Sequence, residues 1–541
     1  MTLRIFEPRT RPPREFRIFG WDIEDNGHGD FVGVSIFDPE NGKACDFQNR
    51  RAFMAELKRR KYRESLFIAH NAEYDIGGIF GKKHLDRFSR YVTVGGQFKT
   101  ARLPVSGGKS ITFIDLHSHI KSSLERIGKQ IDLPKGTDPG LDAPWSVRRP
   151  YCIRDAEIAA RAAVLLQSQY LSLGTSLRAT VGSSAMELFQ RRYLKISWSA
   201  APRSYIDWCY GGYYGGKTEA YRIGYAEGPF NYYDKNSLYP TAMASAILPH
   251  PGFLRFKANP RPSCLDYEGI SDVLISVPRD TKFPVMGLKV GKRLTFPVGS
   301  WRGKYPNSAI RYGISVGKCR ILKIYSTYSS LISGAYLADY ANDLYAKRQE
   351  ATGYNREVIK SLLNNLYGKW AQRGRPTVWK DGAWLTEDSP APVWTCVPWS
   401  AYVTSGGHAL MDPCYTDDTV YTDTDSNITK GEMVTGAGLG DMKLEGRYDA
   451  ILIITSKVYG LLSDNSPAIY HAKGFPIASA RAAVLAGGAT FRAPNRLRES
   501  MRRNLKVNEW LPHTKVLKTN YAKRIIFPDG STAPLVINKP H

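Results

Sequence analysis

Two acidic side chains interrupt an apolar run near the N-terminus, and this feature restricts the fold more than any other. In the run FGWDIED, Asp22 and Glu24 are two residues apart. On a β-strand, whose side chains alternate with a period of two, both would project from the same face. Two like charges held so close together need a cation. The sequence therefore predicts a strand that carries a metal site, although a DxE pair on its own is more often a solvated pair or a helix cap.

Two further carboxylates lie in the same N-terminal part of the chain. Asp75 closes HNAEYD, and Asp155 lies four residues after Tyr151, so that Tyr151 and Asp155 share one face of a predicted helix that opens at Tyr151. Hard oxygen ligands of this kind suit Mg²⁺ or Mn²⁺, which activate a water molecule and steady the leaving oxygen in phosphodiester hydrolysis. With predicted strands at FRIFGWDIED, LFIAHNAEYD and KSITFIDLHS, these segments indicate an α/β unit that ends at about residue 178.

A second set of acids is divided between two segments that lie far apart in the chain. Asp234 follows an aromatic run in NYYDKNSLYP, and VYTDTDSN contains Asp423 and Asp425. On a strand both residues of the second segment would lie on one side, but a turn inside the motif would break this alternation. A carboxylate from each segment, bridged by two divalent ions, would align a 3′-hydroxyl with the α-phosphate of a nucleotide. The alternative for DTD is an exposed polar turn.

Between these acidic segments, the pattern from Ala335 to Trp370 predicts two antiparallel helices with a tight connection near Thr352 and Gly353. At 100° per residue, Lys360, Asn364 and Tyr367 fall within about 60° of one another on the second helix. An adjacent apolar stripe of Ile359, Leu363 and Leu366 would hold this helix on its neighbour. The polar face is then free for a ligand: a lysine can balance triphosphate charge, and a tyrosine can stack on a base or sugar. The alternative is an amphipathic helix with an incidental lysine.

The charge balance indicates a polyanionic partner. Lys and Arg number 75 and Asp and Glu 50, which gives a formal net charge of +25. Nucleic acid is the first expectation and an anionic membrane the second. A basic cluster near the C-terminus is either a solvated face or a face that contacts phosphates; its members are Arg492, Arg496, Arg498, Arg502, Arg503, Lys506, Lys515 and Lys518.

The apolar runs are too short for a membrane span of about 18 to 20 residues, and charged residues stand where a signal peptide would be apolar. The seven cysteines are scattered and contain no CxxC pair. We therefore expect a cytosolic protein with reduced, mostly buried thiols and no membrane partner.

With these residues in view, the chain resembles family B DNA polymerases, particularly the compact protein-primed subgroup of bacteriophages and linear plasmids. The resemblance covers nearly the whole chain, in the family's order. The three exonuclease motifs match Asp22 and Glu24, then Asn71, Tyr74 and Asp75, then Tyr151 and Asp155. The resemblance implies that the acids bind two metal ions, that the tyrosine of the third motif helps to position the attacking water, and that the asparagine and tyrosine of the second hold the 3′ end of the primer.

The polymerase motifs match equally closely. The resemblance makes Asp234 and Asp425 the principal metal ligands and Asp423 their neighbouring acid. It makes Tyr239 the aromatic residue that disfavours a ribose 2′-hydroxyl. The other matches are Lys360, Asn364, Tyr367 and Gly368 in the fingers motif, where Asn365 replaces a common serine; Arg348 as the outer triphosphate ligand; Lys457 and Tyr459 in the KxY motif at the primer terminus; and Tyr213, Gly215 and Gly216 in the YxGG segment between the two modules.

The resemblance implies an α/β multidomain protein, in which an RNase-H-like 3′-5′ exonuclease domain is followed by a right-hand polymerase with two insertions. Asp381-Gly382, between Trp379 and Trp384, predicts a hairpin in the second insertion, which could also be a plain surface hairpin. The expected boundaries are exonuclease 1–178, palm 179–250, first terminal-protein region 251–335, fingers 336–373, second terminal-protein region 374–396, palm 397–476 and thumb 477–541.

The function that follows from the resemblance is DNA-directed DNA synthesis with proofreading. It implies two Mg²⁺ or Mn²⁺ ions at each active site, template-primer DNA and deoxynucleoside triphosphates as partners, and a terminal protein as the primer. The expected state is a monomer in the cytoplasm, of the host cell if the protein is viral. Two alternatives remain: a family B polymerase that starts chains without a primer, and a non-catalytic DNA-binding replication scaffold.

Overall fold

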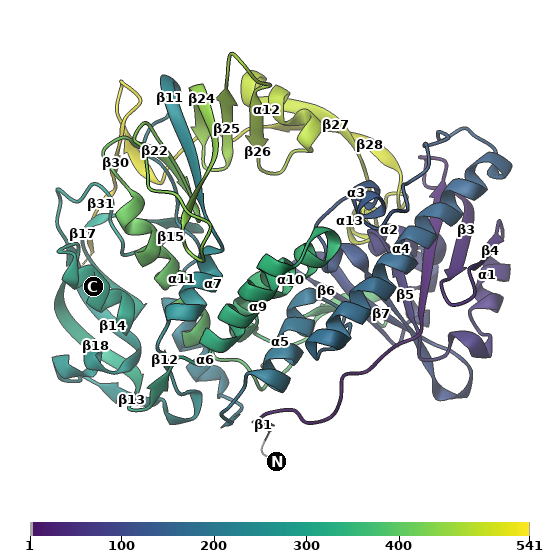
Figure 1. Ribbon diagram of the computed structural model, residues 1–541, viewed down its shortest axis with the longest axis horizontal. Helices are drawn as coiled ribbons and strands as arrows, with labels where there is room; N and C mark the ends of the chain where they lie inside the picture. Colours follow the sequence, from purple (N-terminus) through teal and green to yellow (C-terminus); the bar gives the residue numbers. More distant parts are fainter. Residues whose placement is uncertain (1–3, 540–541) are drawn as a thin grey trace.

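The computed structural model describes residues 4–539. The two lobes of the chain and the segments that join them are arranged in a ring (Figure 1). The N-terminal lobe lies on one side and a second lobe on the other; the helices α9 (Ala338–Glu350) and α10 (Gly353–Asn365) join them below, and the hairpin of β27 (Gly488–Pro494) and β28 (Trp510–Val516) joins them above. Within residues 4–539, no helix combines the length and the apolar character that crossing a membrane requires.

The N-terminal lobe is built on a nine-stranded mixed sheet with the order β21-β20-β6-β7-β8-β5-β2-β3-β4. The three predicted strands are confirmed as β2 (Ile18–Asp25), β5 (Leu66–Ala69) and β8 (Ser110–Asp115), and these three run parallel. Helix α2 (Ala72–Phe80) follows β5 directly. The remaining strands are β3 (Phe31–Asp38), β4 (Lys43–Phe47), β6 (Arg90–Val94), β7 (Gln97–Pro104), β20 (Thr377–Lys380) and β21 (Ala383–Thr386).

Helix α4 (Trp145–Leu173) packs across β2 and β3. Its approach to β2 depends on Gly20, because a Cβ there would lie 1.9 Å from the carbonyl oxygen of Ala156. The prediction that this helix opens at Tyr151 is wrong, because the helix begins at Trp145 and continues through Pro150. The additional first turns are held in place by tertiary contacts, including a buried Arg148 whose guanidinium donates to the carbonyl oxygen of Asp25.

The second lobe contains a seven-stranded antiparallel sheet with the order β10-β22-β23-β11-β24-β25-β26. The strand-turn-strand at VYTDTDSN shows that the turn does fall inside the motif: β22 ends at Asp423 and β23 begins at Ser426, with Thr424 at φ 69°. The simple alternation of Asp423 and Asp425 therefore fails. The strands are β10 (Thr218–Ala220), β11 (Gly224–Lys235), β22 (Thr419–Asp423), β23 (Ser426–Thr429), β24 (Met442–Thr455), β25 (Val458–Leu462) and β26 (Ile469–Ala472).

Helices α9 and α10 form the predicted antiparallel pair, since the Tyr340 hydroxyl near the start of α9 donates to the carbonyl oxygen of Leu362 near the end of α10. The apolar stripe of α10 is buried as expected. The helix ends at Asn365, however, and Tyr367 belongs to the following 3-10 turn, Tyr367–Ala371. Its predicted place on the α10 face is wrong. The Ser400 hydroxyl donates to the Tyr367 carbonyl, and fully buried Trp370 draws the chain into this tighter turn.

The two predicted insertions contain β-structure, and each shares a sheet with a distant part of the chain. The region 251–335 forms a sheet of β13 (Arg255–Ala258), β18 (Arg320–Ser330), β14 (Glu268–Val277) and β17 (Val298–Pro306), and β31 (Val536–Lys539) from the end of the chain pairs with β17. The hairpin β20–β21 is confirmed, with Asp381 and Gly382 both at positive φ as a type I′ turn requires. Strand β20 pairs with β6, so the hairpin extends the N-terminal sheet.

Buried side chains join the parts of the molecule. The largest apolar cluster includes residues of α4, α5 (Val181–Arg192), α9, α10 and α11 (Val397–Met411). A second cluster forms the interior of the N-terminal lobe and also contains Trp379 of β20 and Leu497 of α13 (Leu497–Arg503). All seven cysteines are free, and all but half-buried Cys45 are buried, in agreement with the expectation that most of them are buried.

Two candidate active sites

The first acidic cluster forms where β2, α2 and α4 meet. Asp22 and Glu24 project from one face of β2, and their oxygens lie within 4.8 Å of each other and of the Cys152 sulfur. The backbone N–H of Ile23 donates to Asp75 Oδ1 at 3.3 Å, which places the α2 carboxylate beside the same strand. Asp155 comes from α4. The structure therefore brings together the four acids that the sequence pattern selected.

Burial and mutual repulsion raise the pKa values of these acids. Burial raises the pKa of Asp22, and the charges of Asp155, Asp75 and Glu24 raise it further. Burial also raises the pKa of Asp75. It raises the pKa of Glu24 to about 7 even though the Arg148 guanidinium opposes the shift. A cluster of carboxylates with raised pKa values gains stability from a positive charge placed among them.

The donor set fits a hard divalent cation. Among the described residues, Asp75 Oδ2 and Asp155 Oδ1 are buried and have no hydrogen-bond partner. Carboxylate oxygens are the ligands that Mg²⁺ and Mn²⁺ prefer. The Cys152 sulfur is a poor candidate ligand, because it donates to the carbonyl oxygen of Asp22 at 3.3 Å and burial raises the pKa of the thiol.

Two basic residues complete this cluster, and the sequence reasoning missed both. Lys135 Nζ lies 2.8 Å from Asp155 Oδ2 and 4.8 Å from the centre of the Tyr151 ring. Arg148 forms an ion pair with Glu24. Lys135 lies in a loop with no periodic pattern, and Arg148 lies before the predicted helix start, so no local signal pointed to either residue.

The two remaining residues of the second exonuclease motif lie at the edge of the cluster. Asn71 has a left-handed backbone at φ 72°, its N–H donates to Asp115 Oδ1 at 2.9 Å, and its residue surface is exposed. Tyr74 is half-buried, and its hydroxyl donates to the carboxylate of Asp25. An exposed amide and a fixed aromatic ring beside the acids are suited to holding a strand end.

The second acidic cluster lies on the seven-stranded sheet. Asp234 is on β11 opposite Ser426 of β23, and the N–H of Lys235 donates to the carbonyl oxygen of Asp425 at 2.7 Å. Burial first and then the charge of Asp425 raise the pKa of Asp234 to about 7; Glu445 adds to this shift. Burial also raises the pKa of Asp425. Asp234 and Asp425 are thus a second pair of hard oxygen ligands that fits a divalent cation.

Asp423 differs from these two acids because its carboxylate already has partners. It forms an ion pair with Lys457 and accepts a hydrogen bond from the Thr218 hydroxyl at 2.9 Å. Tyr459 is 4% exposed and packs on Tyr421 with ring centres 4.9 Å apart. Lys457 therefore reaches the turn between β22 and β23, whereas the Tyr459 ring packs within the sheet that carries this turn.

Candidate nucleotide-binding residues surround this turn. The rings of Tyr239 and Tyr367 are 4.5 Å apart. Arg348 donates to the Ser237 hydroxyl at 2.7 Å, where α7 (Leu238–Ser245) begins. Exposed Lys360 lies close enough for its positive charge to oppose part of the upward shift in the pKa of Asp234.

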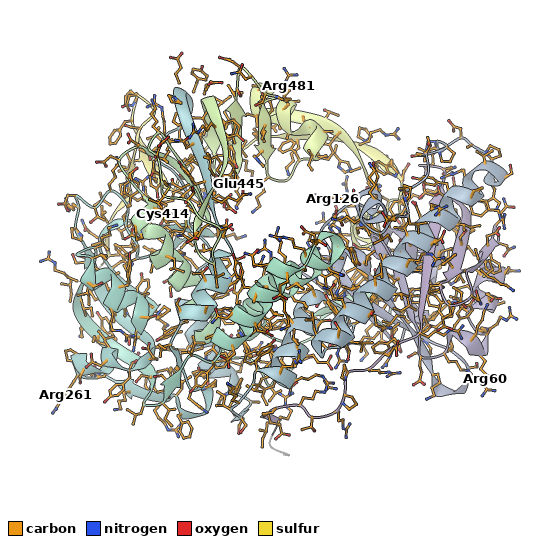
Figure 2. The ribbon with its side chains drawn as sticks, in the orientation of Figure 1. Arg60, Arg126, Arg261, Cys414, Glu445 and Arg481 are labelled. Carbon is orange, nitrogen blue, oxygen red and sulfur yellow. The ribbon has the colours of Figure 1, made fainter. Side chains whose placement is uncertain are left out.

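Lys360 and Asn364 also line a pocket of about 370 Å³ between α10 and the N-terminal lobe. Across this pocket lie Lys121 and Arg126, and Figure 2 shows Arg126 close to α10. Glu445 on β24 faces the interior of the ring from the opposite lobe (Figure 2). The predicted polar face of α10 is therefore available to a ligand.

The YxGG segment passes directly over the turn that contains the acids. A Cβ on Gly216 would lie 2.4 Å from the Thr424 hydroxyl oxygen, so that only glycine permits this approach. The carbonyl oxygen of Gly215 lies 2.8 Å from His408 Nε2, and Tyr213 is half-buried. Gly368 faces open space, with no atom within 4 Å of a Cβ placed there.

Comparisons with known proteins agree with this arrangement. Residues 143–377 match the family described as DNA polymerase type B, organellar and viral. A curated relative, a probable DNA polymerase of Ascobolus immersus, is 25% identical over 281 residues, which are 43% of this chain and 22% of that protein. The matched region is thus about a fifth of the length of this relative.

Similarity to solved structures extends over most of the chain. Phi29 DNA polymerase complexed with primer-template DNA matches with a TM-score of 0.75 at 15% identity, over 93% of this chain and 100% of that chain. The ternary complex of the same polymerase with primer-template DNA and incoming nucleotide substrates has the same TM-score, identity and coverage. The chain therefore has the expected α/β multidomain fold of a nuclease domain joined to a right-hand polymerase, and residues 143–377 confirm its resemblance to family B DNA polymerases.

Proposed function

We propose that the protein is a DNA-directed DNA polymerase with a 3′-5′ proofreading exonuclease. The observation that carries this proposal is the pair of separate acidic clusters, each with raised pKa values and hard oxygen donors, on two lobes of one ring. A scaffold protein has no need of two clusters of mutually repelling acids that are half-buried or buried, because such acids reduce stability unless a ligand neutralises them.

At the polymerase cluster, Asp234 and Asp425 would hold two Mg²⁺ or Mn²⁺ ions, which supply charge stabilisation and polarise the attacking hydroxyl. The side chains of Arg348 and Lys360 bind the triphosphate, and the paired rings of Tyr239 and Tyr367 form a wall against the sugar. Lys457 holds Asp423 and keeps the turn in one conformation.

At the exonuclease cluster, Asp22, Glu24, Asp75 and Asp155 would hold the cations, which lower the pKa of a bound water. Tyr151 orients the attacking water, and Lys135 holds the Asp155 carboxylate in place from 2.8 Å. Asn71 and Tyr74 hold the single-stranded 3′ end.

Primer extension on a singly primed template, with and without deoxynucleotides, reports synthesis and degradation together. We expect Asp234→Ala or Asp425→Ala to reduce incorporation by about 10²- to 10³-fold or more while single-strand degradation persists, because the acids serve separate sites. Asp22→Ala, alone or with Asp75→Ala, should have the opposite effect and allow mismatched primers to be extended. Normal extension by the Asp234 variant would contradict the polymerase assignment. Wild-type degradation by the Asp22, Asp75 double variant would contradict the exonuclease assignment.

For initiation, we propose a hydroxyl offered by a terminal protein. The support is the resemblance to the protein-primed subgroup together with the region 251–335, whose outer surface carries Arg255, Lys257 and Arg261 around a pocket of about 580 Å³. A protein encoded beside the polymerase should become covalently labelled by a radioactive deoxynucleotide in a template-dependent reaction. Long products from single-stranded template with no primer and no partner would favour the primer-independent alternative instead.

A further inference from the structure

Three parts of the chain meet at the side chain of Tyr74. Its hydroxyl donates to the Asp25 carboxylate at the end of β2. The indole N–H of Trp510 donates to the same hydroxyl oxygen at 3.3 Å, and the Asn508 amide donates to the Tyr74 carbonyl oxygen at 2.8 Å. Trp510 and Asn508 belong to the predicted thumb, which is more than 430 residues away in sequence.

The thumb tip, defined here as residues 495–510, is docked on the N-terminal lobe by several independent contacts. Leu497 is 1% exposed and lies in the apolar interior of that lobe. The backbone N–H of Trp510 donates to the carbonyl oxygen of Gly27 at 3.0 Å. Lys506 forms an ion pair with Asp30 at 2.6 Å.

Glycine residues make room for this docked tip. A Cβ on Gly29 would lie 2.3 Å from the Val507 carbonyl oxygen, and one on Gly77 would lie 2.8 Å from a Val507 methyl carbon. Asn508 is 2% exposed and has a positive φ of 62°. The local backbone is thus shaped for one docked arrangement, and Asn508 is fixed where it meets Tyr74.

The contacts of Asp25 connect the thumb tip to the acids of the exonuclease cluster. Asp25 directly follows Glu24 on β2, and its other carboxylate oxygen accepts the N–H of Gly27 at 2.8 Å. The Arg148 guanidinium donates to the Asp25 carbonyl oxygen at 2.7 Å and forms an ion pair with Glu24. A continuous set of hydrogen bonds therefore runs from Trp510 through Tyr74 and Asp25 to a proposed metal ligand.

We infer that Trp510 and Asn508 are positioning residues of the exonuclease site, which hold the Tyr74 ring in the orientation that receives a single-stranded 3′ end. This inference rests on the proposed exonuclease. The site is complete only while the thumb tip is docked, so a change at the tip weakens 3′-end binding. Nucleotide incorporation takes place on the other lobe and does not use this contact.

The test compares Trp510→Phe and Tyr74→Phe, alone and together. Binding of a fluorescent single-stranded oligonucleotide is measured in an Asp22→Ala background, and degradation and primer extension in the otherwise wild-type protein. Trp510→Phe removes one hydrogen bond between neutral groups and should weaken 3′-end binding about 3- to 10-fold. Because Trp510 acts through the Tyr74 hydroxyl, Trp510→Phe should add little once Tyr74 is already Phe.

The matched control is Asp30→Ala, which removes another contact of the docked tip without touching Tyr74. It should leave 3′-end binding within about twofold of wild type, because an exposed ion pair contributes little. Normal primer extension by each variant shows that it has folded. If Trp510→Phe weakens 3′-end binding equally with Tyr74 present and with Tyr74 replaced by Phe, Trp510 acts directly on DNA and the inference is overturned. The inference is also overturned if Trp510→Phe causes no loss of binding in either case.

The same experiment separates this inference from the proposed function. If the wild-type protein fails to degrade single strands, the exonuclease assignment itself fails. If the wild type degrades them and Asp22→Ala does not, but the Trp510 and Tyr74 variants both match the wild type, only the positioning role is wrong.

Discussion

At the scale of single residues, we expect the acids of both candidate sites to respond to pH and to divalent cations. Without a cation, burial raises the pKa of Glu24 to about 7, and burial with the Asp425 charge raises the pKa of Asp234 to about 7. Between the ordinary carboxyl pKa of about 4 and this value, the folded state binds more protons than the unfolded state. The free energy of unfolding of the cation-free protein should therefore decrease as the pH rises through this range.

A divalent cation should oppose this loss, because it neutralises the deprotonated acids. We expect Mg²⁺ to raise the Tm more at pH 8 than at pH 6, measured by thermal denaturation against a chelated sample. The combined Asp22→Asn and Asp234→Asn variant is the control and should lose most of this difference. An equal Mg²⁺ effect at both pH values would show that these acids do not bind the ion.

Tyr239 belongs to the same scale, because sugar selection depends on the space that one ring fills. The ring packs against Tyr367 with centres 4.5 Å apart, and a Cβ on Gly407 would lie 3.3 Å from its edge. We expect Tyr239→Val to increase ribonucleotide incorporation relative to deoxyribonucleotide incorporation by about 10-fold or more, since a missing steric contact of this size corresponds to 1–3 kcal/mol. Competition between the two nucleotides measures the ratio, and an unchanged ratio contradicts this role.

At the scale of secondary-structure elements, the hairpin β20–β21 gains a role from its place in the sheet of the N-terminal lobe. Trp379 is 9% exposed, its indole N–H donates to Asp86 at 2.7 Å, and its ring contacts Trp384. Both tryptophans therefore pack against the apolar interior of the N-terminal lobe. A hairpin fixed in this way can separate a downstream strand as a rigid edge.

The hairpin should therefore matter more for synthesis through duplex DNA than for gap filling. Truncating a large buried side chain by Trp379→Ala should loosen its docking by about 3–5 kcal/mol. We expect strand-displacement synthesis to fall while gap filling persists, measured on matched templates. Leu385→Ala, which changes a residue of the same hairpin that is 46% exposed, is the control. Equal losses on both templates would indicate general misfolding.

At the scale of the whole molecule, the docked thumb tip closes the ring that Figure 1 shows. A closed ring would keep DNA bound while many nucleotides are added to the primer. Leu497→Ala removes a buried side chain from the interface between the thumb tip and the N-terminal lobe and should weaken docking by about 2–5 kcal/mol. We expect shorter products per binding event in the presence of a DNA trap, with single-nucleotide incorporation unchanged. Val516→Ala, at a position that is 74% exposed on the same thumb hairpin, should behave as wild type.

Features that follow a short, regular period could be predicted from the amino-acid sequence alone. Two acids at a spacing of two on β2, the apolar stripe of α10 and the Asp-Gly turn of the second hairpin are confirmed, because each depends on residues close in the chain. The order of the motifs along the chain was sufficient to show the resemblance to family B DNA polymerases and to predict the fold class.

Features that depend on contacts between distant segments became visible only in the folded chain. Lys135 reaches Asp155, β20 joins β6, β31 joins β17, and Trp510 reaches Tyr74 across segments that no local pattern connects. Tyr367 leaves the α10 face for the same reason, since buried Trp370 and Ser400 constrain the chain more strongly than helical periodicity does. A local pattern reports which face of an element is apolar, whereas the partner of that face is chosen by the packing of the complete chain.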